Sequence, residues 1–197
     1  MKLSDIINEA LVVLKNGGVI LYPTDTVWGI GCDATNEKAV AKVYEIKRRS
    51  EAKSLVLLAC DLDMVAKHVR EIPSMAIDLV EVNDAPMTII YPGAQYLAPN
   101  AVAEDGSVGI RIPYVEEGES SPAAFCIELV RRLRRPLVST SANISGEPTP
   151  KCYKEISEEI KSAVDYCVPR QVEAGSTGRS SQIIKLGLDN EVTIIRP

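Results

Sequence analysis

The run Val19-Ile-Leu-Tyr-Pro-Thr-Asp-Thr-Val-Trp-Gly-Ile-Gly-Cys-Asp-Ala34 decides the fold of this chain. Its apolar, β-rich beginning follows two glycines and stops at Pro23, which predicts a buried strand that ends in a loop. The Thr-Asp-Thr sequence at 24–26 then lies directly beyond the strand, where open α/β sheets bind their ligands. Gly29 and Gly31 lack a Cβ, so the backbone there can pass close to a bulky neighbour. The stretch therefore predicts a strand followed by a ligand-binding loop.

Residues 29–34 also fit the G-x-G-x-x-A form of the dinucleotide-binding fingerprint. That fingerprint needs its first glycine at the end of the strand, because its mechanism is a tight turn from strand to helix. Here six residues, Pro23 to Trp28, separate the strand from Gly29. The spacing argues against a dinucleotide site at this position.

The composition indicates one ordinary globular domain, and we expect residues 1–197 to form it. The chain is 46% hydrophobic and 25% charged. No apolar run approaches the ~20 residues that a membrane helix requires. The N-terminal residues predict an amphipathic helix without the apolar core of a signal peptide. We therefore expect a cytoplasmic protein with no membrane contact.

Cysteine, histidine and charge exclude several classes of function. Five scattered cysteines without a C-x-x-C pair favour buried free thiols over a disulfide framework or a zinc site. His68 is the single histidine, which argues against Ser-His-Asp or Cys-His catalysis. A net charge of −5 argues against a protein whose main task is to coat nucleic acid. Basic clusters at 47–53 and 131–135 still offer an anionic ligand local positive charge.

The order of the expected elements predicts one α/β domain with a mixed sheet, because the last two strands follow each other without a helix between them. We expect helices at about 5–15 and at 61–69, 74–82, 121–134 and 153–160. A further helix should begin at a cap, either Thr35 or Asn36, and end in the basic cluster that starts at Lys47. We expect strands at 19–22, 54–59, 87–91, 108–113, 136–138, 164–168, 182–186 and 192–195.

Three groups of residues could carry chemistry, and each has a structural explanation as well. Lys47 and Arg49 end a helix, where the helix dipole favours cations, but Lys and Arg together also suit a polyphosphate. Residues 139–146, rich in hydroxyl groups, read as a loop that either binds an anion or forms a capped turn. Arg111 and Arg196 stand among β-branched residues, either at the surface end of a strand or facing an anion. No G-x-x-x-x-G-K-[ST] motif is present, which excludes a standard P-loop.

Five motifs then resemble, in order, those of the YrdC-type threonylcarbamoyl-AMP synthases. They are YPTDTVWGIGCDA, KRR followed by SLVLL, SVGIRIP, PLVSTSANISGEPTP, and SSQIIKL with IIRP. The resemblance runs from Leu21 to the C-terminus and implies a single-domain, twisted open mixed sheet flanked by helices, with a concave, positively charged cleft. It implies that L-threonine, bicarbonate or CO2, and ATP yield threonylcarbamoyl-AMP and pyrophosphate. A partner transferase would then modify ANN-decoding tRNAs.

The resemblance also implies roles for individual residues. Lys47 and Arg49 would meet the ATP phosphates and carry the catalysis, although Arg48 competes with Arg49 for that role. Mg²⁺ would accompany ATP, held by phosphates and water rather than by protein ligands. Nucleotide contacts are expected from Lys47, Arg49, Lys53, Ser107, Ser139, Ser141, Asn143, Thr149 and Arg196, and threonine contacts from Thr26, Arg111, Ser141 and Ser181.

Two alternatives remain at this stage. A non-catalytic module could bind double-stranded RNA or rRNA in the same basic cleft through its phosphates. A related carbamoyl-adenylate chemistry occurs in hydrogenase-maturation proteins that share this domain. The zinc-finger and acylphosphatase portions of those proteins are not found in this sequence.

Overall fold

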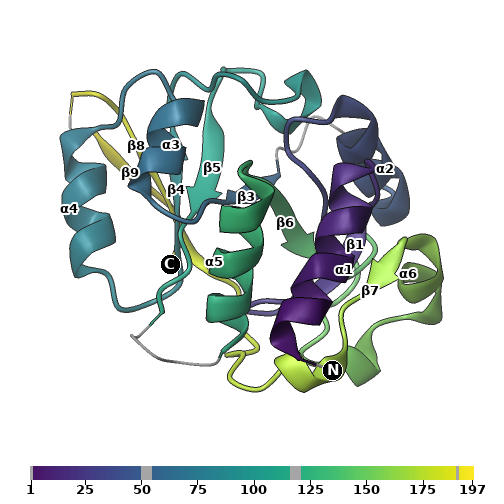
Figure 1. The fold of residues 1–197 in the computed structure, drawn as a ribbon. Helices are drawn as coiled ribbons and strands as arrows, with labels where there is room; N and C mark the ends of the chain where they lie inside the picture. The colour runs from purple at the N-terminus through teal and green to yellow at the C-terminus, as the bar shows by residue number, and fades with distance from the viewer. Residues whose placement is uncertain (1, 50–54, 116–120, 190) are drawn as a thin grey trace.

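A nine-stranded twisted sheet forms the centre of the computed structural model, which describes residues 2–49, 55–115, 121–189 and 191–197 (Figure 1). The strand order is β7-β1-β2-β6-β3-β5-β4-β8-β9, and parallel and antiparallel pairs both occur. This confirms the predicted mixed α/β sheet. The strands are β1 (Ile20–Pro23), β2 (Trp28–Gly31), β3 (Val56–Leu58), β4 (Met87–Tyr91), β5 (Val108–Arg111), β6 (Leu137–Ser141), β7 (Tyr166–Cys167), β8 (Gln182–Leu186) and β9 (Val192–Arg196).

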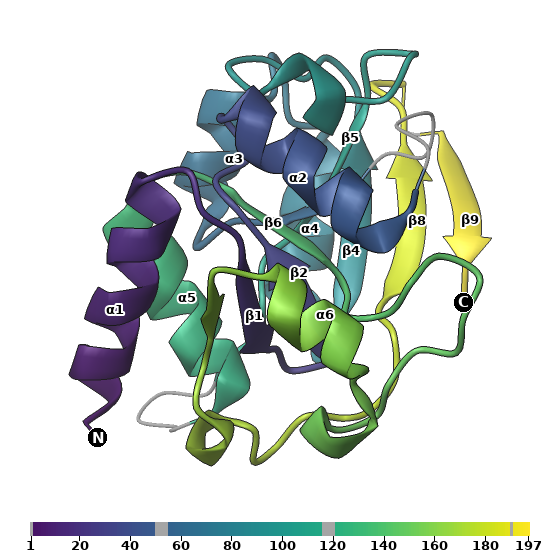
Figure 2. The same ribbon diagram turned by 90° about the vertical axis from the view of Figure 1, so that its right-hand side faces the viewer.

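Helices flank the sheet unevenly. Four of them, α1, α3, α4 and α5, lie on one face, and α2 and α6 lie near the end that holds β1, β2 and β7 (Figures 1 and 2). Over β5, β4 and β8 the opposite face carries no helix in the described part of the chain (Figure 2). The helices are α1 (Leu3–Lys15), α2 (Glu37–Lys47), α3 (Leu62–His68), α4 (Ser74–Val82), α5 (Pro122–Leu133) and α6 (Glu158–Ala163), with 3-10 turns at Pro99–Ala101, Tyr153–Glu155 and Arg170–Val172.

Apolar stripes at helical spacing explain how these helices pack. The predicted face of α1 is buried and packs against α5. The cap of α2 is Asn36, whose side chain accepts a hydrogen bond from the backbone N–H of Ala39. Ser121 caps α5 in the same way, and Pro122 occupies its first turn as expected. No helix among the described residues is long and apolar enough to span a bilayer.

Gly31 is needed where β2 pairs with β6. A Cβ on Gly31 would lie 2.2 Å from the carbonyl oxygen of Val138 and 2.7 Å from a ring carbon of Tyr22. The Tyr22 hydroxyl donates a hydrogen bond of 3.1 Å to that same carbonyl oxygen. The bulky neighbour expected from the sequence is therefore an adjacent strand together with a buried tyrosine.

Several boundaries differ from the prediction. Strand β2 was not expected, because its two glycines are typical of a loop. Since both glycines lie within a strand, they do not form the turn from strand to helix that a dinucleotide-binding site requires. Ser139 and Ser141 belong to β6 rather than to a loop, because they pair with β3 and β2. The helix expected at 153–160 is a 3-10 turn followed by α6, and α1 begins at Leu3, before the expected start. The predicted strand at 54–59 includes Ser54, which lies outside the described residues.

Candidate active site

A cavity of about 220 Å³ opens where several distant segments of the chain meet. The β1–β2 loop, the end of α2, strands β5 and β6, and the β8–β9 region all contribute to its wall. Guanidinium and hydroxyl groups dominate the polar part of this wall, a combination that suits an anionic ligand. The polar side chains on the wall include those of Thr26, Arg49, Arg111, Ser139, Ser141, Ser181 and Arg196.

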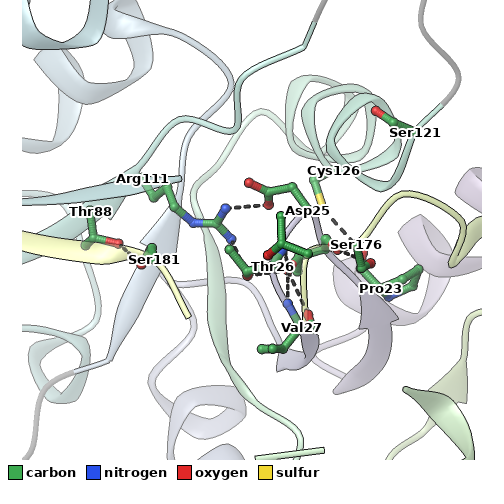
Figure 3. A network of polar contacts seen from close by, with 12 residues as sticks. Pro23, Asp25, Thr26, Val27, Thr88, Arg111, Ser121, Cys126, Ser176 and Ser181 are labelled. Atoms are coloured by element: carbon green, nitrogen blue, oxygen red, sulfur yellow. Dashed lines mark hydrogen bonds and ion pairs between the residues drawn. The ribbon is translucent and has the colours of Figure 1, made fainter. Parts of the chain in front are cut away.

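Arg111 is the most buried cation in the wall, with 4% of its side chain exposed. One guanidinium nitrogen forms an ion pair with Asp25, and the other lies 3.5 Å from the hydroxyl oxygen of Thr26 (Figure 3). A buried arginine needs such a counter-ion, because an unpaired buried charge is strongly destabilising. Asp25 therefore fixes the guanidinium plane beside Thr26 and the cavity.

The Thr24 side chain shapes the loop that carries Asp25 and Thr26. Its hydroxyl oxygen accepts hydrogen bonds from the backbone N–H groups of Thr26 and Val27, at 3.1 and 3.2 Å. The same hydroxyl lies 2.7 Å from the carbonyl oxygen of Val27, to which it donates. Side-chain bonds of this kind stabilise turns locally. The Thr-Asp-Thr sequence is therefore a rigid turn that places Thr26 at the cavity.

A second loop, ahead of β8, is bonded to this turn. Backbone N–H groups of Thr177 and Gly178 donate to the carbonyl oxygens of Asp25 and Thr26, at 2.8 and 2.7 Å. The Ser176 hydroxyl donates to the carbonyl oxygen of Thr24 (Figure 3). The loop that leads to Ser181 is therefore held against the site.

Ser181 and Arg196 bring the C-terminal hairpin to the same cavity. The Ser181 hydroxyl lies 2.8 Å from that of Thr88, and Arg196 donates through Nε to the Ser181 carbonyl oxygen at 2.8 Å. Desolvation lowers the pKa of Arg196 below its ordinary value. The guanidinium group is thus partly removed from water at the edge of the cavity, where an anion would replace the lost solvation.

Lys47 lies behind the wall rather than on its surface. Only 2% of this residue is exposed, and its Nζ donates to the carbonyl oxygens of Ser141 and Asn143, the latter at 2.7 Å. Desolvation, and secondarily the charge of Arg49, lower the pKa of Lys47 to about 8. The ammonium group therefore fixes the end of β6, whose serines line the cavity.

Arg48 and Arg49 lie in different surroundings: Arg48 at the surface and Arg49 at the cavity. Arg48 adopts a left-handed conformation with φ 49° as the C-cap of α2, and its side chain forms an exposed ion pair of 2.6 Å with Glu159. Arg49 lines the cavity, and desolvation lowers its pKa. The reversal of the chain at the C-cap thus directs the second arginine, not the first, to the site.

Besides Lys47, four of the residues singled out from the sequence do not line the cavity or lie outside the described residues. Ser107 bonds Asp105 at 2.5 Å, and Thr149 is exposed outside the cavity. Asn143 does not line the cavity, and its amide nitrogen bonds the carbonyl oxygens of Ile144 and Glu147. Lys53 lies outside the described residues.

Sequence reasoning placed Thr24 and Asp25 in the ligand-binding loop without an individual role, and did not single out Ser176. The Thr-Asp-Thr sequence predicted a ligand-binding loop, but it did not predict the ion pair between Asp25 and Arg111.

A protein-held metal does not fit this wall. Among the described residues, no three His, Cys, Asp or Glu side chains gather into a possible metal site. The donors that line the cavity are cationic or hydroxyl groups, which attract an anion rather than a bare cation. Any divalent ion here would have to arrive with its own anionic ligands.

The fold and the cavity together define a class: an α/β protein whose twisted mixed sheet carries a cavity lined by arginine side chains and hydroxyl groups. The chain belongs to the Sua5–YciO–YrdC family, whose model carries the description "Telomere recombination" and matches residues 12–197. Family membership thus covers nearly the whole sequence.

Two curated relatives and one solved structure place the chain further. A candidate threonylcarbamoyl-AMP synthase of Methanocaldococcus jannaschii is 36% identical over 92% of this chain and 80% of its own length. The threonylcarbamoyl-AMP synthase of Stenotrophomonas maltophilia is 33% identical over 81% of this chain and 83% of its own length. The crystal structure of P. abyssi Sua5 complexed with L-threonine superposes with a TM-score of 0.81 at 23% identity, over 94% of this chain. This chain spans 52% of that Sua5 chain, and the likeness concerns the fold.

Proposed function

We propose that this chain is a threonylcarbamoyl-AMP synthase. The observation that carries the proposal is the convergence of Arg49, Arg111 and Arg196 with Thr26 and Ser141 on one cavity. Family membership and the synthases among its relatives support it. The L-threonine complex of the similarly folded Sua5 supports threonine as the amino-acid substrate.

In the proposed reaction the threonine amine adds to CO2 with loss of a proton, or to bicarbonate with loss of water, and gives N-carboxy-threonine. Its new carboxylate oxygen attacks the α-phosphorus of ATP, the bond from that phosphorus to the bridging oxygen breaks, and pyrophosphate leaves with the electron pair. The product is threonylcarbamoyl-AMP. Both nucleophiles are intrinsically reactive, so the protein has to hold the reactants together and neutralise charge, and no histidine is required.

The cavity divides naturally between the two substrates. Arg111, held by Asp25, and Thr26 form one side, which suits threonine, together with Ser181. Arg49 and Arg196 supply charge for the phosphates, and Ser139 and Ser141 offer hydroxyl donors. Lys47 contributes by fixing the end of β6 through two carbonyl oxygens.

Three further parts of the proposal depend on molecules outside the chain. Mg²⁺ would enter with ATP and screen the negative charge of the phosphates. The unstable product would pass to a transferase that modifies adenosine in ANN-decoding tRNAs. Ser107, Asn143, Thr149 and Lys53 remain proposed nucleotide contacts only if bound ATP extends beyond the cavity wall.

The direct test is pyrophosphate release by the purified protein with ATP, Mg²⁺, bicarbonate and L-threonine. Release should depend on threonine, and Arg49→Ala should lower it by ~10²-fold or more, the scale for losing a preorganised charge contact. Serine should be a poorer substrate, because a methyl group in an apolar pocket contributes ~1–3 kcal/mol. Pyrophosphate release that ignores threonine would contradict the proposal.

The RNA-binding alternative is not favoured, because the relatives named above are synthases. It predicts RNA affinity that falls steeply with salt and no threonine-dependent turnover. Direct contact with RNA could still accompany the synthase activity. A filter-binding titration at two salt concentrations alongside the pyrophosphate assay would separate the two functions.

A further inference from the structure

A second cavity, of about 320 Å³, is lined by residues of α4, α5 and the opposite face of the same sheet. In Figure 1, α4 and α5 lie on the same side of that sheet. Side chains alternate along a strand, so neighbouring residues face opposite sides. On β5, Ile110 lines this second cavity, whereas Arg111 lines the proposed active site. On β4, Met87, Ile89 and Tyr91 face the second cavity. The two cavities are therefore separated by the sheet itself.

Most of the residues that line the second cavity have apolar side chains. Val80 of α4 and Ile127 of α5 face Met87, Ile89 and Ile110 of the sheet across it. Packed interiors leave few voids of this size, and ligand sites combine apolar walls with a small number of polar groups. At about 320 Å³ the cavity is at the small end of the range for ligand sites.

Tyr91 supplies one polar group inside this apolar wall. The residue is 1% exposed and lines the cavity. Burial raises the pKa of Tyr91, so the hydroxyl remains protonated and can donate. A tyrosine hydroxyl at the wall of a cavity can donate a hydrogen bond to a ligand atom or to water there.

Arg131 supplies the second polar group, at the exposed side of the cavity. Its side chain is 58% exposed, and it shares the single carboxylate of Glu128 with Arg132, at 3.1 and 2.6 Å. Two guanidinium groups on one carboxylate leave a net positive charge. An anionic group at this position would be attracted, whereas a cation would be repelled.

We propose that the second cavity binds a small amphipathic anion, with its apolar body between α4, α5 and the sheet, a polar atom at the Tyr91 hydroxyl, and its carboxylate at Arg131. The site is distinct from the ATP and threonine site and does not depend on the proposed function. The ligand class follows from the three features above: an apolar wall, one inward hydroxyl and one outward positive charge.

Octanoate is a suitable probe, and isoleucine methyl NMR is a suitable readout. Titration below the micellar range should shift the methyl signals of Ile89, Ile110 and Ile127 saturably, and leave Ile6 on α1 unmoved. Octanol should bind more weakly than octanoate. The absence of saturable shifts, or shifts spread equally to Ile6, would overturn the proposal.

Variants test each contact separately. Tyr91→Phe should weaken octanoate binding by ~2–10-fold, the range for one net hydrogen bond. Arg131→Gln should weaken octanoate but not octanol by ~2–5-fold, as for an exposed ion pair, and the matched control Arg132→Gln should change neither.

Ile127→Trp should fill the cavity and abolish binding, with circular dichroism to verify folding. If it fails to fold, the Tyr91 and Arg131 variants decide the question. Unchanged octanoate affinity in both would contradict the assignment.

Discussion

Ile110 and Arg111 are neighbours on β5, yet they line two cavities, on opposite faces of the sheet, that differ in their lining side chains. On the polar face, Arg111 is held by Asp25, and the hydroxyl groups of Thr24, Thr26 and Ser181 each lie within hydrogen-bonding distance of another hydroxyl group. On the apolar face, Tyr91 supplies a hydroxyl group to a wall that consists mostly of apolar side chains. The comparison teaches that the polar face is organised in advance for charged substrates, whereas the apolar face offers shape and little fixed charge.

The largest expected difference between the faces comes from one strand. Arg111→Ala should lower threonine-dependent pyrophosphate release by ~10²–10³-fold, because a preorganised charge is lost and Asp25 is left unpaired. Ile110→Val should leave turnover nearly unchanged and lower the free energy of unfolding by about 0.5–1.5 kcal/mol. The assay is initial-rate pyrophosphate release, with urea melts for stability. Equal losses of turnover in both variants would break the comparison.

Lys47 tests whether the polar face depends on support from behind its wall. Lys47→Ala removes the ammonium that holds the Ser141 and Asn143 carbonyl oxygens, and should lower turnover by ~10²-fold or more. Arg48→Ala is the matched control, because its exposed ion pair with Glu159 contributes at most ~1 kcal/mol to stability and does not touch the cavity. Comparable effects of the two substitutions on turnover would show that the active site does not depend on the contacts of Lys47 behind its wall.

The depressed pKa of Lys47, about 8, predicts a pH dependence. Above that pH the folded protein loses the Lys47 proton, so kcat/KM for ATP should fall about ten-fold from pH 8 to 9.5. The unfolded chain keeps the proton up to the ordinary pKa of 10.5, so the unfolded state binds more protons between these values. The Lys47 contribution to the free energy of unfolding therefore rises with pH in this window. A pH-rate profile that is flat to pH 9.5 would contradict the assignment.

The two glycines of β2 give the smallest expected effects on catalysis and separate folding from binding. Gly31→Ala places a Cβ against the Val138 carbonyl oxygen and should lower the free energy of unfolding by about 1–3 kcal/mol. At Gly29 the nearest atom would lie 3.4 Å away, so Gly29→Ala should fold normally but raise KM, because its methyl group enters the cavity. Thermal melts and Michaelis kinetics distinguish the two outcomes.

Much of the fold was readable from hydrophobic patterns. The strand at 87–91 and the helix at 74–82 have the predicted bounds, because each is a continuous apolar or amphipathic run between clear stop signals. Strand β2 was missed, because its glycines suit a loop locally and only pairing with β1 and β6 makes them a strand. The serines of β6 were read as loop for the same reason.

The types of residue in the site could be predicted from the sequence, but not which of their side chains reach the cavity. The sequence could not separate Arg48 from Arg49, because the choice depends on a left-handed C-cap at Arg48. It also could not reveal that Lys47 is buried, since a cation at a helix end is usually solvated. The ion pair between Asp25 and Arg111 joins segments 86 positions apart and required the folded chain.

The central claim is that one cavity holds the nucleotide against the amino acid. The most direct measurement is a crystal structure of this chain with L-threonine and a non-hydrolysable ATP analogue. The account predicts both ligands in the cavity, threonine within hydrogen-bonding distance of Arg111, and the phosphates beside Arg49 and Arg196. A nucleotide bound on the other face of the sheet, or threonine and nucleotide in separate cavities, would contradict it.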